Sequence, residues 1–322
     1  MRRRSVLAAI GALASGAVWP AGATLYRGAA LAFGTTISVT LIHTDRRQAE
    51  LAIGAALRAA QRIDRLMSIY DPASQVYQLN RDGQLAAPAP ELLQVLALAR
   101  RLSVLSDGAF DVTVQPLWTV FSAAAARAAL PVPLQRDQAR ARVGWRHLTF
   151  DRQQVCLRQP GMAITLNGVA QGYAADVALA AVRAHGIRHA LLDTGEFIAR
   201  GDRQGAPWTL GIGDPRHTDQ LATTLRLDGR ALSTSGDYEM AFTPDFLHHH
   251  IFDPALGDSP TELASVSVTA PSGLLADGLS TAFMVMGLQR ARALAARLPG
   301  VGLLAIDKQG RAWRSAGFPA PA

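Results

Sequence analysis

The sequence has 322 residues, and 49% of them are hydrophobic, which is enough for one large core or two modest ones and excludes a disordered polymer. The formal charge of +7 comes from scattered arginines, with Lys308 the only lysine, so we predict that the protein binds no nucleic acid. The single cysteine, Cys156, excludes an intramolecular disulfide and lies too far from the N-terminus to carry a lipid.

An export signal is predicted at residues 1–23. Three arginines at 2–4 precede an apolar run at 6–18, and Ala21-Gly22-Ala23 is a small-x-small cleavage site that leaves a mature chain from Thr24. Residues 3–7 also fit a twin-arginine signal, with a general secretory signal as the alternative. The run is shorter than the roughly 20 residues that span a bilayer, so we expect a soluble periplasmic protein with no stable membrane insertion after cleavage.

The first half of the mature chain predicts a strand and two long helices. A β-branched, roughly alternating stretch at 35–42 predicts a strand, and a helix is expected at 47–67. A second helix at 90–106 carries apolar residues at helical spacing and stops at Asp107-Gly108. The Ala/Arg-rich segment 123–142 is interpreted as a helical excursion or surface insertion without chemistry.

The second half alternates short strands with helices. Strands are expected at 148–150, 155–157, 163–166, 189–193, 208–212, 223–227, 231–234, 266–270 and 302–307, and helices at 173–185, 272–286 and 289–297. This order lacks the regular strand-helix-strand rhythm of a doubly wound parallel sheet, so the predicted fold class is α+β.

Several common catalytic and nucleotide-binding motifs are absent from the sequence. It contains no Gly-x-x-x-x-Gly-Lys-Ser/Thr phosphate loop, no Gly-x-Gly-x-x-Gly between a strand and a helix, and no Gly-x-Ser-x-Gly elbow. Any nucleotide is therefore bound by another device.

Two polar side chains share one face of the helix predicted at 272–286. Asp277 and Thr281 stand four residues apart, so a carboxylate and a hydroxyl can reach one hard cation. Magnesium prefers a few protein oxygens and completes its shell with waters and substrate phosphates. The alternative is that Asp277 only stabilises the helix N-terminus and Thr281 is a surface residue.

The loop from Asn167 to Tyr173 has two glycines between a predicted strand and a helix, so its backbone can approach a ligand closely, although a simple turn also explains it. Residues 106–111 place an aromatic ring and a carboxylate after a helix end, where a glycine cap is the alternative. Residues 234–238 close a strand with hydroxyls and a glycine, and a plain turn is the alternative.

Three adjacent histidines, His248 to His250, supply the residue type that exchanges protons near neutral pH. If they lie in a strand, side chains alternate and His248 shares a face with His250. A solvent-facing or metal-scavenging cluster is the alternative.

Taken together and in this order, these stretches resemble the ApbE family of FAD:protein FMN transferases over residues 24–322. The motifs are Met67-Ser68-x-Tyr70-Asp71-Pro72, Asp107-Gly108-Ala109-Phe110-Asp111, Gly168-Val169-Ala170-x-Gly172-Tyr173, Thr234-Ser235-Gly236-Asp237-Tyr238 with His250-Ile251-x-Asp253-Pro254, and Ala276-Asp277-x-x-x-Thr281. The resemblance implies a two-part α+β fold with mixed or antiparallel sheets and FAD in the cleft between the parts.

The resemblance also implies one reaction. FAD is split at its pyrophosphate, AMP leaves, and FMN is joined through its phosphate to a threonine or serine of an acceptor flavoprotein, here one of an exported or membrane-bound electron-transport complex. Some members instead hydrolyse FAD to FMN and AMP, and loss of turnover would leave an FAD-binding protein.

The family's functional residues carry over to matching positions of this chain. Magnesium is expected at the carbonyl of Ala170 with Asp277 and Thr281, and His250 is the expected base. The FAD site is expected to be lined by Phe33, Tyr70, Ala109, Phe110, Asp111, Asn167, Tyr173 and Phe252. The chain departs from the family's usual residues at Phe33-Gly34-Thr35, at Gln171 and at Gly195-Glu196-Phe197, and none of these changes touches the three metal ligands.

Overall fold

The structure is a computed structural model that describes residues 22–203, 205–217 and 219–322. Residues 1–21 of the predicted export signal lie outside the described residues. The first strand, β1 (Thr24–Ala32), begins at the residue expected to start the mature chain. Within the described residues, none of the helices is long and apolar enough to cross a membrane.

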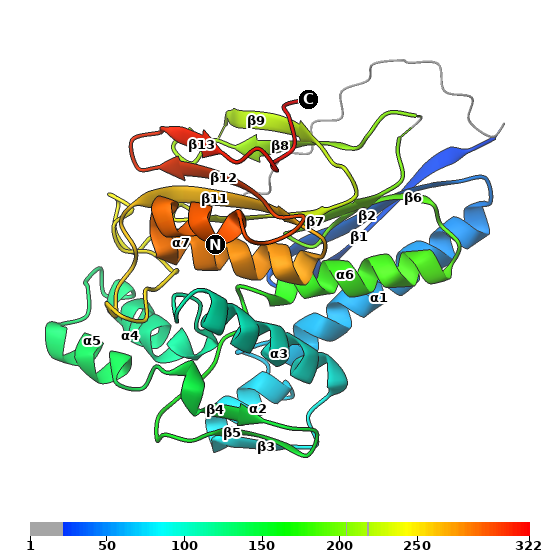
Figure 1. Cartoon of the computed structure of the whole chain (residues 1–322). Helices are drawn as coiled ribbons and strands as arrows, with labels where there is room; N and C mark the ends of the chain where they lie inside the picture. The colour runs from blue at the N-terminus through cyan, green and yellow to red at the C-terminus, as the bar shows by residue number, and fades with distance from the viewer. Residues whose placement is uncertain (1–21, 204, 218) are drawn as a thin grey trace.

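An eight-stranded antiparallel sheet is the centre of the molecule (Figure 1). Its strands, in spatial order, are β1, β2 (Thr35–His43), β6 (His189–Asp193), β7 (Phe197–Arg200), β10 (Ala231–Gly236), β11 (Leu263–Ala270), β12 (Gly302–Asp307) and β13 (Ala312–Arg314). The order brings strands from both halves of the chain into one sheet, because β2 pairs with β6 and β7 pairs with β10.

Both faces of this sheet are covered. Three helices lie along one face, namely α1 (Arg46–Met67), α6 (Ala170–Ala184) and α7 (Gly273–Ala295) (Figure 1). A hairpin of β8 (Thr209–Gly213) and β9 (Leu221–Arg226) packs on the other face, where Leu210, Ile212 and Leu225 form a second core with sheet residues such as Leu232. Every residue of β11 is buried as a result.

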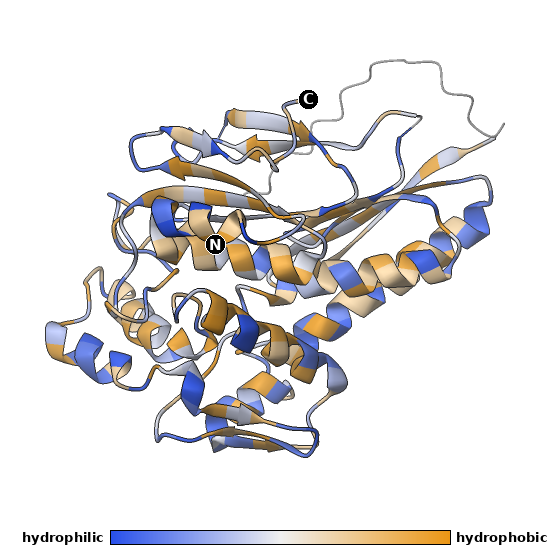
Figure 2. Cartoon of the chain, in the orientation of Figure 1, coloured by the Kyte–Doolittle hydropathy of each residue, from blue (hydrophilic) through white to orange (hydrophobic). Residues whose placement is uncertain are grey.

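The second part of the molecule lies beyond the three helices and holds α2 (Gln75–Asp82), α3 (Pro90–Leu105), α4 (Gln115–Ala125) and α5 (Pro133–Arg140) (Figure 1). A small sheet of β3 (Gln84–Ala86), β5 (Gln154–Leu157) and β4 (Leu148–Phe150) completes it. The helix α5 is mostly hydrophilic in Figure 2, which agrees with the predicted surface excursion.

The long helix α1 forms because its sequence supplies a cap and a small-residue stripe. The Asp45 carboxylate accepts hydrogen bonds from the backbone N–H groups of Arg47 (2.8 Å) and Gln48 (3.2 Å). Its buried residues recur at helical spacing and are mostly alanine, namely Ala49, Ala52, Ile53, Ala56, Ala60, Ile63 and Met67. The alanines let α6 pack closely alongside.

The start of α7 is fixed by α6. The Asp176 carboxylate accepts hydrogen bonds from the backbone N–H groups of Gly273 (2.7 Å) and Leu274 (2.9 Å). At Gly172, an added Cβ would lie 2.1 Å from the Gly273 carbonyl oxygen, so the two backbones touch. This contact brings the N-terminal turns of both helices to one place.

The predicted α+β class is confirmed, and most predicted helices and strands are found within a few residues. One predicted strand is wrong, because residues 163–166 form no strand. The strand considered for the three histidines does not form either: residues 248–250 lie in an irregular segment with one isolated bridge from His249 to Ala241. The two predicted C-terminal helices form one element, α7, interrupted at the left-handed Gly287. The sequence did not predict β1, β3, β7, β13 or α2, and α4 begins eight residues before the segment 123–142 that was predicted as a helical excursion or surface insertion.

Replacing Gly172 by alanine is expected to lower the free energy of unfolding by about 1–3 kcal/mol, because the new methyl group cannot fit against the Gly273 carbonyl. Gly54→Ala is the matched control, since its Cβ meets only the flexible end of Arg58 at 3.0 Å. That change should raise helix stability slightly. Urea denaturation followed by circular dichroism measures the free energy of unfolding of both variants. Equal changes in the two variants would contradict the close contact between Gly172 and Gly273.

Candidate functional site

A cleft of about 750 Å³ opens where the sheet, the helix layer and the second part of the molecule meet. It is lined by residues from the β1–β2 turn, the end of α1, the segments 109–114 and 165–171, the β6–β7 turn, β8, β10 with the following loop, 250–252, and α7. The predicted site residues come from six of these segments, so the fold brings together positions that lie far apart in sequence.

Eleven of the twelve predicted site residues line this cleft. They are Phe33, Tyr70, Ala109, Phe110, Asp111, Asn167, Ala170, His250, Phe252, Asp277 and Thr281. Tyr173 differs: it is buried in the core, and its hydroxyl donates a hydrogen bond to the Gln94 side chain of α3 (2.6 Å). The structure therefore places Tyr173 between α6 and α3 rather than at the cleft wall.

The glycine loop and the Asp277–Thr281 face of α7 are in direct contact. An added Cβ at Gly168 would lie 2.9 Å from Thr281 Oγ1, and one at Gly172 would lie 2.6 Å from Asp277 Cβ. The backbone N–H of Gly172 donates to Asp277 Oδ2 (2.8 Å). Each glycine thus stands where the loop must approach one of the two predicted ligand side chains.

Asp277 lies in an unfavourable electrostatic environment for a carboxylate. It is 4% exposed, and burial raises its pKa to about 7, with a further contribution from the charge of Asp176. Glu196 at the β6–β7 turn is also buried, and burial together with the Asp277 charge raises its pKa well above the usual range. A cation at this end of the cleft would relieve both effects.

A group of hydroxyls holds the α7 face of the cleft. Ser235 Oγ lies 2.7 Å from Ser280 Oγ and 3.3 Å from Thr281 Oγ1, and the Ser280 hydroxyl donates to the Asp277 carbonyl (2.8 Å). Because Ser235 is on β10, these bonds fix Thr281 relative to the sheet. Sequence reasoning noted residues 234–238 but did not place Ser235 beside Thr281.

The oxygens around Ala170, Asp277 and Thr281 suit a hard cation. A carbonyl, a carboxylate and a hydroxyl are magnesium ligands in kind, and the loop lies close to Thr281 at Gly168 and to Asp277 at Gly172. Among residues 22–203, 205–217 and 219–322, no three His, Cys, Asp or Glu side chains group as a metal site. The donor set predicted from the sequence differs from such a group, because it combines a carbonyl, a carboxylate and a hydroxyl.

The structure separates the three histidines. His248 Nδ1 lies 2.7 Å from Asp258 Oδ1, and the other Asp258 oxygen accepts from Arg136 (2.7 Å), so His248 belongs to a pair outside the cleft. His249 is fully buried with Nε2 3.0 Å from the Pro260 carbonyl, and burial lowers its pKa to about 4. Only His250 lines the cleft, and the predicted shared face with His248 is wrong because no strand forms here.

Aromatic groups stand at the cleft wall. Phe33 and Gly34 form the two-residue turn between β1 and β2, with φ values of 54° and 69°, which presents the Phe33 ring to the cleft. Tyr70 is 67% exposed and meets the Trp118 ring edge-on at 6.4 Å. Trp118 lines the cleft too, although no sequence motif marked it.

Asp111 organises the segment that carries Phe110. One carboxylate oxygen accepts hydrogen bonds from the backbone N–H (2.8 Å) and the hydroxyl (2.6 Å) of Thr113. The other oxygen accepts a hydrogen bond from the backbone N–H of Trp145 (2.9 Å). Burial raises the pKa of Asp111. Its carboxylate therefore fixes the cleft wall from behind.

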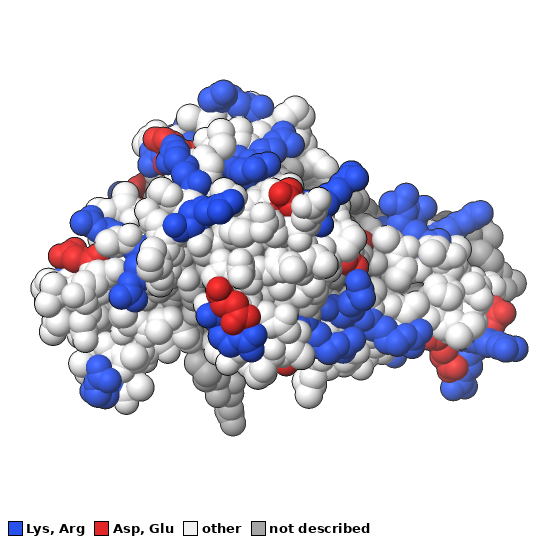
Figure 3. Space-filling view, turned by 90° about the horizontal axis from the view of Figure 1, so that it is seen from below, with Lys and Arg blue, Asp and Glu red and all other residues white. Residues whose placement is uncertain are grey.

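Charge on the outer surface is distributed rather than concentrated. On the face seen in Figure 3, arginine side chains spread across the full width of the molecule, several beside a carboxylate. Ion pairs of the described residues include Arg46 with Glu50 and Arg62 with Glu91, each at 2.7 Å. On this face, the distribution matches the scatter of arginines along the sequence.

Comparison with known proteins gives a family for this fold and cleft. Solved structures of the same architecture include the ApbE protein of Thermotoga maritima, with a TM-score of 0.81 and 28% identity, and the flavin transferase ApbE of Vibrio cholerae, with a TM-score of 0.79 and 26% identity. Each comparison covers 92% of this chain and 98% of the solved chain.

The sequence profile of the ApbE family matches residues 33–305, so the chain belongs to the ApbE family. It is 33% identical over 299 residues to the FAD:protein FMN transferase of Salmonella typhimurium, covering 88% of this chain and 84% of that protein. It is 30% identical over 318 residues to the FAD:protein FMN transferase of Treponema pallidum, and this alignment covers 91% of this chain and 87% of that protein.

Asp277→Asn is expected to raise the thermal midpoint of the metal-free protein at pH 8. Burial raises the folded-state pKa of Asp277 from 3.8 to about 7, so the carboxylate contributes its full destabilisation above pH 7 and none below about pH 3.8. The rise in the thermal midpoint of the variant should disappear as the pH falls from about 7 to 3.8. Added magnesium should raise the thermal midpoint of the wild type more than that of the variant.

Differential scanning fluorimetry with and without magnesium measures these shifts, and Asp107→Asn is the control because Asp107 is exposed. If magnesium raises the thermal midpoint of the Asp277 variant as much as that of the wild type, the assignment of Asp277 as a ligand is contradicted.

Proposed function

We propose that this chain is a magnesium-dependent FAD:protein FMN transferase that attaches FMN through a phosphoester to a threonine or serine of an acceptor flavoprotein. The observation that carries the proposal is the convergence of Gly168 and Gly172 on Thr281 and Asp277, in a cleft that His250 also lines. Relatives named FAD:protein FMN transferase support the reaction.

The side chains have distinct tasks in this proposal. The Ala170 carbonyl, Asp277 and Thr281 would hold the magnesium ion, which supplies positive charge to the pyrophosphate oxygens of the transition state. His250 accepts the proton of the acceptor hydroxyl as that oxygen attacks the FMN phosphorus. The bond to the AMP phosphate breaks, and AMP leaves.

The aromatic wall gives FAD its binding surface. Phe33 and Tyr70 offer rings for the flavin or adenine, and the Phe110 ring, only 3% exposed, contributes an edge of the wall. Asn167 at the entrance of the glycine loop offers an amide. Tyr173 does not line the cleft, and its hydroxyl bonds to Gln94 in the core, so no contact of Tyr173 with FAD is part of this proposal.

The proposal includes export. A signal at residues 1–23 would deliver the domain of residues 24–322 to the periplasm, where flavoproteins of respiratory or electron-transport complexes expose their hydroxyl residues. The exposed Tyr70 beside Trp118 offers such an acceptor an aromatic contact at the cleft mouth.

His250→Ala is expected to lower kcat for FMN transfer by about 10²- to 10⁴-fold, because the acceptor hydroxyl loses its base. The assay incubates the protein with FAD, magnesium and an acceptor domain, then follows the covalent flavin fluorescence on a denaturing gel and AMP release by chromatography. His147→Ala, at an exposed position outside the cleft, should remain fully active.

Two outcomes would contradict parts of the proposal. Free FMN and AMP released at the same rate without any acceptor would make the protein an FAD pyrophosphatase. FAD binding without FMN transfer or FAD hydrolysis, unchanged in the His250 variant, would make it a flavin-binding protein.

A further inference from the structure

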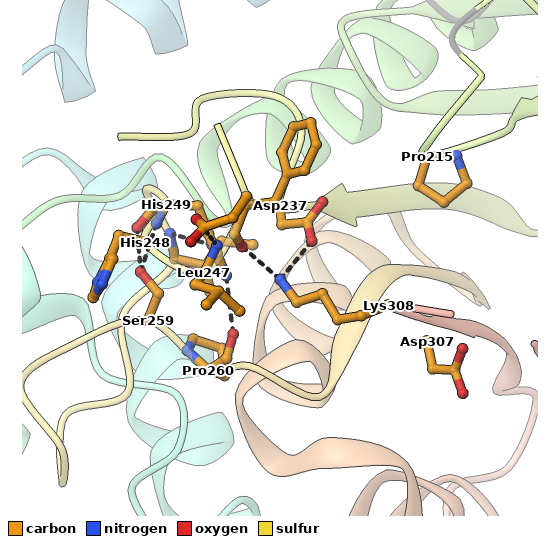
Figure 4. Close-up of polar contacts among 12 residues, drawn as sticks. Pro215, Asp237, Leu247, His248, His249, Ser259, Pro260, Asp307 and Lys308 are labelled. Carbon is orange, nitrogen blue, oxygen red and sulfur yellow. Dashed lines mark hydrogen bonds and ion pairs between the residues drawn. The ribbon is translucent and has the colours of Figure 1, made fainter. Parts of the chain in front are cut away.

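The only lysine of the chain lies in an ion cluster behind the loop that carries His250. The Asp237 carboxylate is fully buried and accepts hydrogen bonds from both terminal nitrogens of Arg216, each at 2.8 Å. Lys308 Nζ donates to Asp237 Oδ2 at 2.6 Å (Figure 4). We call these three residues the Asp237 cluster, and none of them lines the cleft.

The Asp237 cluster joins three separate elements. Asp237 directly follows β10, and its backbone N–H donates to Ala264 of β11 (2.9 Å). Lys308 directly follows β12, and Arg216 lies between β8 and β9 of the covering hairpin. A buried carboxylate with two cations is therefore the point where the sheet and the hairpin layer meet.

Lys308 also holds the loop that follows Asp237. Its ammonium group donates a second hydrogen bond to the Phe246 carbonyl (2.6 Å). Phe246 has a left-handed backbone with φ of 59°, and the Arg216 guanidinium lies 4.6 Å from the centre of its ring. Both cations of the Asp237 cluster thus contact the tip of the loop.

The two arms of this loop carry cleft residues. The Phe242 N–H donates to the His248 carbonyl (2.7 Å), and the His250 N–H donates to the Met240 carbonyl (3.0 Å), so the arms run side by side. Tyr238, Glu239 and Met240 line the cleft from one arm, and His250 lines it from the other. A contact that fixes the loop tip therefore fixes His250 relative to α7.

We propose that Lys308 is a positioning residue for the transfer reaction: by joining Asp237 to the Phe246 carbonyl, it holds the 238–250 loop in the form that presents His250 to the cleft. The proposal rests on the function proposed above. It explains what a single lysine does in a chain whose other 31 basic residues are arginines, since Lys+Arg is 32. A compact ammonium reaches both oxygens at 2.6 Å.

Two substitutions in the Asp237 cluster differ in how much they are expected to destabilise the fold, so an effect on the position of the loop can be distinguished from an effect on folding. Lys308→Met removes one cation but leaves the Asp237 carboxylate bonded twice to Arg216, and the methionine retains most of the apolar stem. Asp237→Asn leaves two cations without their carboxylate, so it is expected to be the more destabilising change. Lys308→Met is accordingly the informative variant.

The test compares wild type, Lys308→Met, Lys308→Arg and Arg230→Met. Arg230 is the matched control, because it also bonds an aspartate, Asp228, and two loop carbonyls, those of Gly300 and Gly317, away from the cleft. Lys308→Met should lower kcat about 10- to 100-fold with KM for FAD within about twofold, since displacement of a base by about 1 Å has effects of this size. Lys308→Arg should recover part of kcat, and Arg230→Met should retain kcat within about twofold.

Amide hydrogen exchange gives a readout that does not depend on activity. Residues 238–250 should exchange faster in Lys308→Met than in wild type, with α1 and α6 unchanged. Unchanged exchange in this loop, or a kcat equal to that of wild type, would overturn the positioning role. A wild-type protein without FAD turnover would contradict the proposed function alone, and the exchange comparison would still decide whether Lys308 holds the loop.

Discussion

The contact between Gly172 of α6 and Gly273 of α7 is the constraint on which the site depends. Because an added Cβ would lie 2.1 Å from the Gly273 carbonyl, only glycine allows the two helices to approach this closely. The approach places the Gly172 N–H at Asp277, while Asp176 one turn further along α6 caps the start of α7. The packing of two core helices and the geometry of the candidate magnesium site are therefore one feature.

Three buried carboxylates of this chain fall into two kinds of surroundings. Asp237 is bonded to Arg216 and Lys308, so its charge is compensated inside the protein. Asp277 and Glu196 lie at the cleft, and burial raises the pKa of both. Two cations of the protein balance the charge of Asp237, whereas the raised pKa values of Asp277 and Glu196 make their end of the cleft a candidate position for a cation. The fold accordingly accepts a local cost in stability at the candidate site.

Much of the fold was predictable from local patterns. The alanine stripe of α1, the cap at Asp45 and the periodicity of α3 and α7 each depend on neighbours within a few turns. The predictions of secondary structure failed where contacts with residues distant in the sequence determine the backbone conformation. The strand predicted at 163–166 does not form: Asn80 holds both backbone groups of Ile164 with its side chain. The edge strand β1 was missed because its pairing with β2 outweighs its weak composition.

The sequence by itself determined the candidate donor groups, because the spacing of Asp277 and Thr281 and the glycines at 168 and 172 limit which groups one helix and one loop can offer. Tertiary structure alone decided which groups meet. It assigned His250 rather than His248 to the cleft, turned Tyr173 toward Gln94, and brought Glu196 and Ser235 to the α7 face. These outcomes follow from long-range packing of the sheet and helices, which no local pattern encodes.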